Sequence, residues 1–176
     1  ARLLNEVTPV RDQGDTNLCW AYSQVMVECF HNGEEFSQKK ADERAEEIAR
    51  SESLRKYGYE DAWDRGGNPT NVDYSKVIYP RDINGIQGLQ NLLIEADGPI
   101  YASYWNGKTG EDYKGHIVVV TGADVYWDNV YTNNPWGNRG KQSYEEFLNG
   151  FDTGFLGDDS GMVLHYVSIP IWDDKT

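Results

Sequence analysis

The sequence predicts an α+β fold in which a helical half packs against an antiparallel sheet half, with a cleft between them. Apolar residues recur at helical spacing in the first hundred positions, between Tyr22 and Leu93. A dense β-branched run from Gly115 to Ala123 and an alternating pattern from Gly161 to Pro170 are typical of strands. We expect a single domain of 176 residues, with the helical half at about 13–98 and the sheet half at about 99–176 together with the N-terminal segment.

The composition is that of a folded protein and narrows the range of partners. Hydrophobic residues make up 39% of the chain and aromatic residues 13%, which is too apolar for a disordered segment. A formal net charge of −13 argues against nucleic acid and anionic membrane surfaces as partners. The sequence has no signal peptide and no transmembrane run, and its start at Ala1 is compatible with a mature or excised domain.

The first predicted helix is buried. From Trp20 to His31, apolar residues occupy most of the helix circumference, which favours a helix that runs through the interior. Cys19 lies at the start of this helix. Cys29 follows ten residues later, about 15 Å away at 1.5 Å per residue, so the two cysteines are too far apart for a disulfide. We interpret Cys29 as a small buried apolar residue.

The second predicted helix lies at the surface. The stretch from Ser37 to Lys56 is charged almost throughout and has a thin apolar stripe at helical spacing, formed by Ala41, Ala45, Ile48 and Ala49. We interpret the charged run as a solvated face rather than a partner site.

The rest of the chain alternates between loops, helices and strands. Gly66-Gly67-Asn68-Pro69 predicts a loop, and apolar spacing from Asn84 up to an Asp97-Gly98-Pro99 stop predicts a third helix. A capped helical turn is expected at Ser143–Leu148, since Ser143 and Glu146 can form a capping box. The predicted strands are Ile100–Trp105, Gly115–Ala123, Val125–Thr132 and a closing strand within Gly161–Pro170.

Cys19 has the surroundings of a reactive thiol. A cysteine in the first helical turn lies at the positive end of the helix dipole, which favours the thiolate. Gln13 precedes it by six residues, across the turn-forming pair Gly14-Asp15. The backbone N–H of Cys19 and the side-chain amide of Gln13 could together bind an oxyanion formed when the sulfur attacks an acyl carbon.

These residues resemble the nucleophile region of papain-like cysteine peptidases. The resemblance rests on Val7–Gly14 and on Cys19-Trp20-Ala21-Tyr22-Ser23. It implies that Cys19 is the nucleophile and that Gln13 donates to the oxyanion hole. One departure is that Thr16-Asn17-Leu18 stands where the family commonly has a disulfide-bonding cysteine and small residues, so that anchor is missing.

The second half of the chain carries the other half of the resemblance, which extends to about Gly137. His116 begins one predicted strand, and Asn134 and Trp136 follow the next. The resemblance implies that His116 is the general base and acid, that Asn134 accepts a hydrogen bond from its ring, and that Trp136 shields this bond. Pro135 departs from the serine usual in the family and leaves Asn133 as an alternative orienting residue.

The resemblance also suggests substrate-binding residues and a subgroup of the family. Gly66 and Gly67 are similar to a glycine pair that lines the cleft and binds the substrate backbone, although a plain turn is an equal alternative. The segment from Pro135 to Phe147 is more similar to bacterial papain-like peptidases of the bacteriocin-processing kind. His31 and His165 are interpreted as structural residues.

The sequence therefore predicts a cysteine peptidase, a thiol protease that hydrolyses peptide bonds through a thioester acyl-enzyme. We expect a polypeptide substrate, no cofactor or metal, no membrane insertion, and a secreted or cell-surface bacterial protein. A removed pro-segment or an inhibitor protein are further candidate partners. Two alternatives stay open at this point: a glutamine deamidase or transamidase of the same chemistry, and an inactive papain-like binding module.

Overall fold

A computed structural model describes residues 17–33, 37–150, 155–156 and 161–172. Gln13 lies outside these ranges. The helices are α1 (Cys19–Asn32), α2 (Gln38–Tyr57), α3 (Pro80–Ile83), α4 (Gly85–Ala96) and α5 (Tyr144–Asn149). The strands are β1 (Ile100–Trp105), β2 (Gly115–Asp124), β3 (Asn129–Asn134), β4 (Asn138–Gln142) and β5 (Val163–Ser168). Two short 3₁₀ helices lie at Tyr74–Lys76 and Gly110–Asp112.

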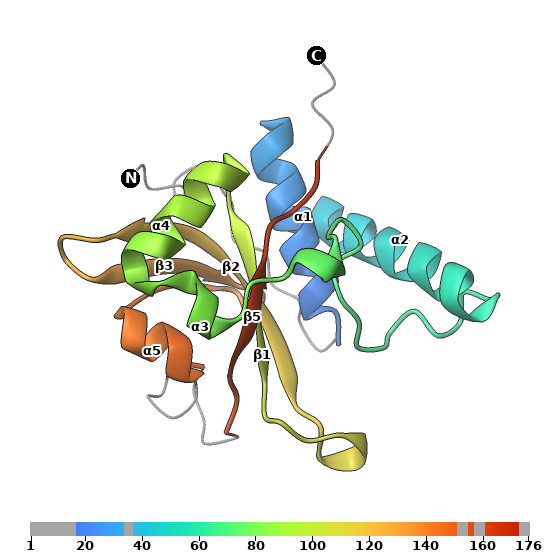
Figure 1. Ribbon diagram of the computed structural model, residues 1–176. Helices are drawn as coiled ribbons and strands as arrows, with labels where there is room; N and C mark the ends of the chain where they lie inside the picture. The colour runs from blue at the N-terminus through green and yellow to red at the C-terminus, as the bar shows by residue number, and fades with distance from the viewer. Residues whose placement is uncertain (1–16, 34–36, 151–154, 157–160, 173–176) are drawn as a thin grey trace.

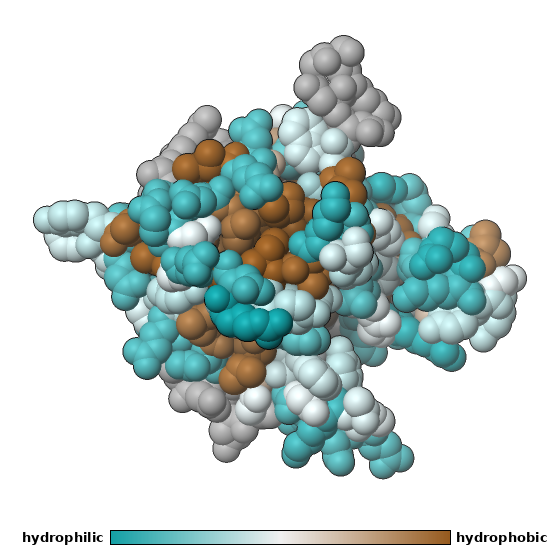
Figure 2. Space-filling view, viewed as in Figure 1, coloured by the Kyte–Doolittle hydropathy of each residue, from teal (hydrophilic) through white to brown (hydrophobic). Residues whose placement is uncertain are grey.

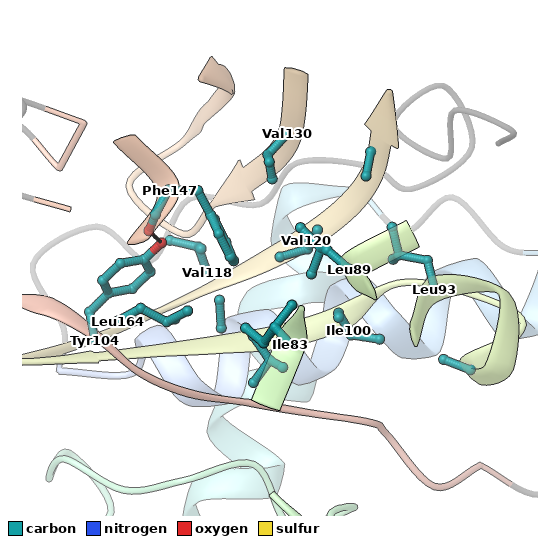
Figure 3. Close-up of a cluster of buried hydrophobic side chains, with 14 of the residues drawn as sticks. Ile83, Leu89, Leu93, Ile100, Tyr104, Val118, Val120, Val130, Phe147 and Leu164 are labelled. Carbon is teal, nitrogen blue, oxygen red and sulfur yellow. Dashed lines mark hydrogen bonds between the residues drawn. The ribbon is translucent and has the colours of Figure 1, made fainter. Parts of the chain in front are cut away.

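The five strands form one antiparallel sheet in the order β4-β3-β2-β1-β5 (Figure 1). Successive residues of a strand point to opposite faces, so β1 and β2 supply side chains to two separate cores. One core contains Tyr101, Ile117 and Val119 together with residues of α1 and α2. The other contains Val118 and Val120 together with residues of α3, α4 and α5 (Figure 3). The predicted α+β architecture is confirmed.

The two long helices take the predicted roles. α1 is buried along most of its length and packs between α2 and β2. α2 buries the predicted stripe of Ala41, Ala45, Ile48 and Ala49, while Ser37 caps its first turn by accepting from Lys40 N–H. Its charged residues form a hydrophilic surface on the right of Figure 2. On the same face of the molecule, apolar residues gather between α4 and β5.

The predicted turn and strand boundaries fail at two places. Strand β3 begins at Asn129 rather than Val125, because the Asp124 carboxylate accepts hydrogen bonds from the N–H groups of Tyr126 and Trp127 and holds them in a turn. Asp128, with φ of 53°, completes that turn. Strand β4 was not predicted, since its sequence Asn-Arg-Gly-Lys-Gln has no β-branched or apolar residue.

Within the described ranges, none of the helices combines the length and the apolar character needed to cross a membrane.

Candidate active site

The start of α1 places Cys19 against the start of β2. α1 begins at Cys19, a half-buried residue whose sulfur is shielded from solvent, and continues with the buried Trp20 and Ala21. The Ser23 hydroxyl donates to the Ile117 carbonyl at 3.4 Å, which seats the first turn of α1 on β2. The backbone N–H of Ile117 lies close enough to the Cys19 sulfur to lower the pKa of the thiol. Cys19 therefore lies beside the residue that directly follows His116.

The hairpin of β2 and β3 brings His116 and Asn134 together. Val119 pairs with Asn133, so Val118 and Asn134 are neighbours on one face, and His116 lies two residues from Val118 on that face. The distance from His116 Nε2 to Asn134 Oδ1 is 2.8 Å. His116 is 4% exposed, so this hydrogen bond forms away from bulk water.

Trp136 covers this pair and fixes the orientation of the Asn134 amide. Its indole stacks on the His116 ring at 4.2 Å between centroids and an interplanar angle of 24°. Its backbone N–H donates to Asn134 Oδ1 at 3.0 Å, which identifies that atom as the oxygen. An oxygen in this position can only accept, so Nε2 of His116 carries a proton and Nδ1 is the ring nitrogen available as a base.

The electrostatics of the site correct one prediction from the sequence. The helix dipole was expected to favour the Cys19 thiolate, but burial raises the pKa of Cys19 to about 11. The N–H groups of Ile117, Trp20 and Cys19 lower this pKa and do not offset the loss of solvation. Burial likewise lowers the pKa of His116 to about 4, against the opposing effect of Asn134. In both groups, burial therefore favours the uncharged form.

The loop that carries Gly66 and Gly67 packs against α1 at Trp20. The Trp20 indole Nε1–H donates to the Arg65 carbonyl at 3.2 Å, which brings the loop against α1. A Cβ built on Gly67 would lie 3.0 Å from Trp20 Cε2, whereas one built on Gly66 would meet no atom within 4 Å. Gly67 is thus required by packing, and Gly66 faces open space.

Tyr113 belongs to the surroundings of the site and was missed by the sequence analysis. It is an exposed residue of the loop between β1 and β2, and its hydroxyl lies over Gly115. Burial raises its pKa, with smaller contributions from the negative charges that Cys19 and Tyr166 would carry. No local pattern marks Tyr113, because its nearness to Cys19 depends on how a hairpin folds over a helix start nearly a hundred residues earlier.

The remaining histidines and the second cysteine occupy other environments. His31 stacks on Trp172 at 3.9 Å, and His165 packs against Trp105 at 4.9 Å. Cys29 is buried in the core between α1, α2 and the sheet. Within the ranges that the structure describes, no group of three or more His, Cys, Asp or Glu side chains is arranged to bind a metal ion.

Comparison with known proteins adds evidence of a different kind. A sequence model of the family described as papain-like cysteine protease AvrRpt2 matches residues 5–152. That range contains Gln13, Cys19, His116, Asn134 and Trp136. The comparison with curated proteins found no match. Among solved structures, the chain is similar to the Pseudomonas avirulence protein AvrPphB, at 13% identity and a TM-score of 0.36, over 94% of this chain and 98% of that one.

Proposed function

Because the chain belongs to the AvrRpt2 family of papain-like cysteine proteases, we propose that it hydrolyses peptide bonds with Cys19 as nucleophile and His116 as general base and acid. Asn134 orients His116 in this proposal. The chain is a cysteine peptidase, and its substrates are polypeptides. The finer assignment of residues and the thioester intermediate are our inference.

The observation that carries the proposal is the buried hydrogen bond between His116 and Asn134 beneath Trp136. It holds the imidazole ring with Nε2 protonated and leaves Nδ1 as the acceptor for a proton from the Cys19 thiol. The backbone of Ile117, the residue that follows His116, lies beside the Cys19 sulfur, which supports this assignment. The 2.8 Å distance from His116 Nε2 to Asn134 Oδ1 favours Asn134 over Asn133 as the orienting residue, because successive residues of β3 point to opposite faces of the sheet.

The reaction proceeds in two stages. In the first, the thiol proton of Cys19 moves to Nδ1 of His116 as the sulfur attacks the carbonyl carbon of the peptide bond. The C–N bond then breaks, and His116 returns the proton to the leaving amine, which leaves a thioester on Cys19. In the second, His116 takes a proton from water as the water oxygen attacks the thioester carbon. The C–S bond then breaks, the acid product leaves, and His116 gives the proton to the Cys19 sulfur.

The raised pKa of Cys19 and the lowered pKa of His116 favour a reaction that starts from the neutral thiol and the neutral imidazole. Burial disfavours a lone thiolate and a lone imidazolium, so each charge forms at low cost only beside the other. A bound substrate that excludes water from the site strengthens this mutual attraction. We infer that charge separation accompanies substrate binding rather than preceding it.

The oxyanion of each tetrahedral intermediate needs donors near the sulfur. The N–H of Cys19, as the first residue of α1, has no acceptor within the helix and is one such donor. We propose the Gln13 side chain as the other. Loss of one oxyanion donor costs on the order of a hundred- to a thousandfold in turnover. Gln13→Ala should therefore hydrolyse substrate slowly and still react normally with iodoacetamide, since alkylation forms no oxyanion.

The test of the proposed function is a peptide-library digest by the wild-type chain and by Cys19→Ala, with Cys29→Ala as the matched control. Wild type and Cys29→Ala should cleave the same peptides, and Cys19→Ala should cleave none. Release of ammonia without new peptide termini would instead indicate a deamidase. No reaction of Cys19 with substrate or iodoacetamide would indicate a binding module. The secreted or cell-surface location stays a prediction.

A further inference from the structure

We propose that Asp64 is a positioning residue, which fixes the turn before Cys19 against the loop that carries Gly66 and Gly67. The inference rests on the proposed role of Cys19 as nucleophile. Asp64 acts on the reaction only through the backbone that it holds, and it touches neither the sulfur nor the substrate.

The contact that carries the proposal joins two distant parts of the chain. The backbone N–H of Asn17 donates to Asp64 Oδ1 at 3.1 Å, across 47 residues of sequence. Asn17 precedes Cys19 by two residues. The residue between them, Leu18, is the N-cap of α1 and forms no side-chain cap hydrogen bond. A local Ser, Thr, Asp or Asn usually caps a helix start. Leu18 cannot do so, and the Asp64 carboxylate instead accepts from the N–H of Asn17, one residue before the cap.

Asp64 is one end of a clamp between α1 and the glycine loop. Asn17, Trp20 and Gln24 are spaced by three and four residues, which places them on one side of the helix and its approach. Asn17 N–H donates to Asp64, and Trp20 donates to the Arg65 carbonyl at 3.2 Å. The Gln24 amide nitrogen donates to the Thr70 hydroxyl at 2.8 Å, and its oxygen accepts from the Thr70 N–H at 2.9 Å and from the Thr70 hydroxyl at 3.2 Å.

The clamp fixes the position of Cys19 relative to Gly66, the proposed contact for the substrate backbone. Its middle contact packs Gly67 on the Trp20 indole, and Gly66 next to it faces open space. Cys19 lies between Asn17 and Trp20 in sequence. A substrate backbone that bound at Gly66 would therefore be aligned with the sulfur by the same three contacts. Trp20 and Gln24 are buried and also support the core, whereas Asp64 is exposed.

Exposure of Asp64 separates its effect on catalysis from its effect on folding. A hydrogen bond in contact with water adds little to stability, because water replaces the lost partner. The reaction rate is more sensitive than stability to the loss of such a contact, since a displacement of about 1 Å near the reacting atoms can cost on the order of a hundredfold in rate. Removal of Asp64 should thus lower turnover more than it lowers the thermal midpoint.

The experiment compares Asp64→Ala with Asp64→Asn and with the control Asp61→Ala, which removes an exposed carboxylate three residues earlier. Asparagine keeps the Oδ1 acceptor and removes the charge. We expect Asp64→Ala to lose about tenfold or more in kcat with KM and thermal midpoint nearly unchanged, within the range that misplacement produces. Asp64→Asn and Asp61→Ala should retain wild-type kcat to within about twofold.

Three results would overturn the inference. They are an Asp64→Ala variant with wild-type kcat, an Asp64→Asn variant as slow as Asp64→Ala, and a loss that appears equally in Asp61→Ala. If Asp64→Ala does not fold, Asp64→Glu replaces it, because glutamate keeps the charge and displaces the acceptor. Cys19→Ala is measured beside these variants. Its retained activity would refute the proposed function, whereas an inactive Cys19→Ala with a fully active Asp64→Ala would refute only the role of Asp64.

Discussion

His116 and Asn134 meet with 2.8 Å between Nε2 and Oδ1, and the indole of Trp136 stacks over the pair. The register of β2 and β3 places both side chains on one face of the sheet. The Trp136 backbone also donates to the same Asn134 oxygen. Asn134 therefore holds the edge of the imidazole ring and Trp136 covers its face. These contacts leave Nδ1 as the ring nitrogen that can accept a proton.

The first prediction compares His116 with His165. His116→Ala should lose nearly all peptidase activity, because no other group is proposed to accept the Cys19 proton. His165→Ala should keep turnover and lose the packing of His165 on Trp105, Tyr79 and Tyr166. Both variants are assayed on one peptide substrate after circular dichroism shows that they are folded. An active His116→Ala beside a folded but inactive His165→Ala would reverse the assignment.

The second prediction concerns the orienting residue. Asn134→Ala removes the acceptor for Nε2–H but leaves the base itself, so turnover should fall by less than in His116→Ala. Asn134→Asp keeps an oxygen acceptor at the same position and should recover part of the loss. Asn133→Ala serves as the comparison, with activity expressed per folded molecule. A larger loss in Asn133→Ala than in Asn134→Ala would make Asn133 the orienting residue.

The third prediction links the buried His116 to stability. Its pKa is lowered from 6.5 to about 4 in the folded chain, so between these values the unfolded chain binds more protons. The free energy of unfolding should therefore rise with pH across this interval. The contribution of the neutral His116 is lost as the pH falls from about 6.5 toward 4. The size of the shift corresponds to roughly 3.5 kcal/mol of unfolding free energy at most.

The measurement is urea unfolding of the wild type and His116→Gln at pH 7, 6, 5 and 4. Burial also lowers the pKa values of His31 and His165, so the wild-type slope contains their contributions. The difference between the two proteins isolates His116, and His116→Gln should lose less stability on acidification. Identical pH profiles would mean that the His116 pKa is not lowered in the folded chain.

Sequence patterns predicted those elements whose signals are local. Strand β1 has the predicted bounds, and the capping box of Ser143 and Glu146 forms as expected. Strand β4 escaped prediction because its pairing with β3 is set by the turn after Asn134, where Gly137 N–H donates to the Asn134 carbonyl, and not by apolar residues. Local propensity cannot reveal a polar edge strand of this kind.

Some features of the candidate site could likewise be predicted from the sequence, and others depend on tertiary packing. His116, Asn134 and Trp136 could be singled out by the resemblance of their flanking segments to papain-like peptidases, and the structure brings all three together. The pKa of Cys19 could not be predicted, because it depends on how closely β2 covers the sulfur. Asp64 carries no signal of its own in the sequence, and only the packing of its loop on α1 brings it to Asn17.

The last prediction separates the two glycines at 66 and 67. A methyl group on Gly67 would lie 3.0 Å from the buried Trp20 indole, so Gly67→Ala must shift the loop or the ring and should lower the thermal midpoint. A methyl group on Gly66 meets no atom within 4 Å, so Gly66→Ala should fold with nearly wild-type stability. The same methyl group would occupy space where a substrate backbone is proposed to lie, and KM should therefore rise. Thermal unfolding and steady-state kinetics on both variants provide the test, with iodoacetamide labelling to show that Cys19 stays reactive. A stable Gly66→Ala with unchanged KM would mean that Gly66 forms a plain turn, and the substrate-binding role would have to be assigned elsewhere in the cleft.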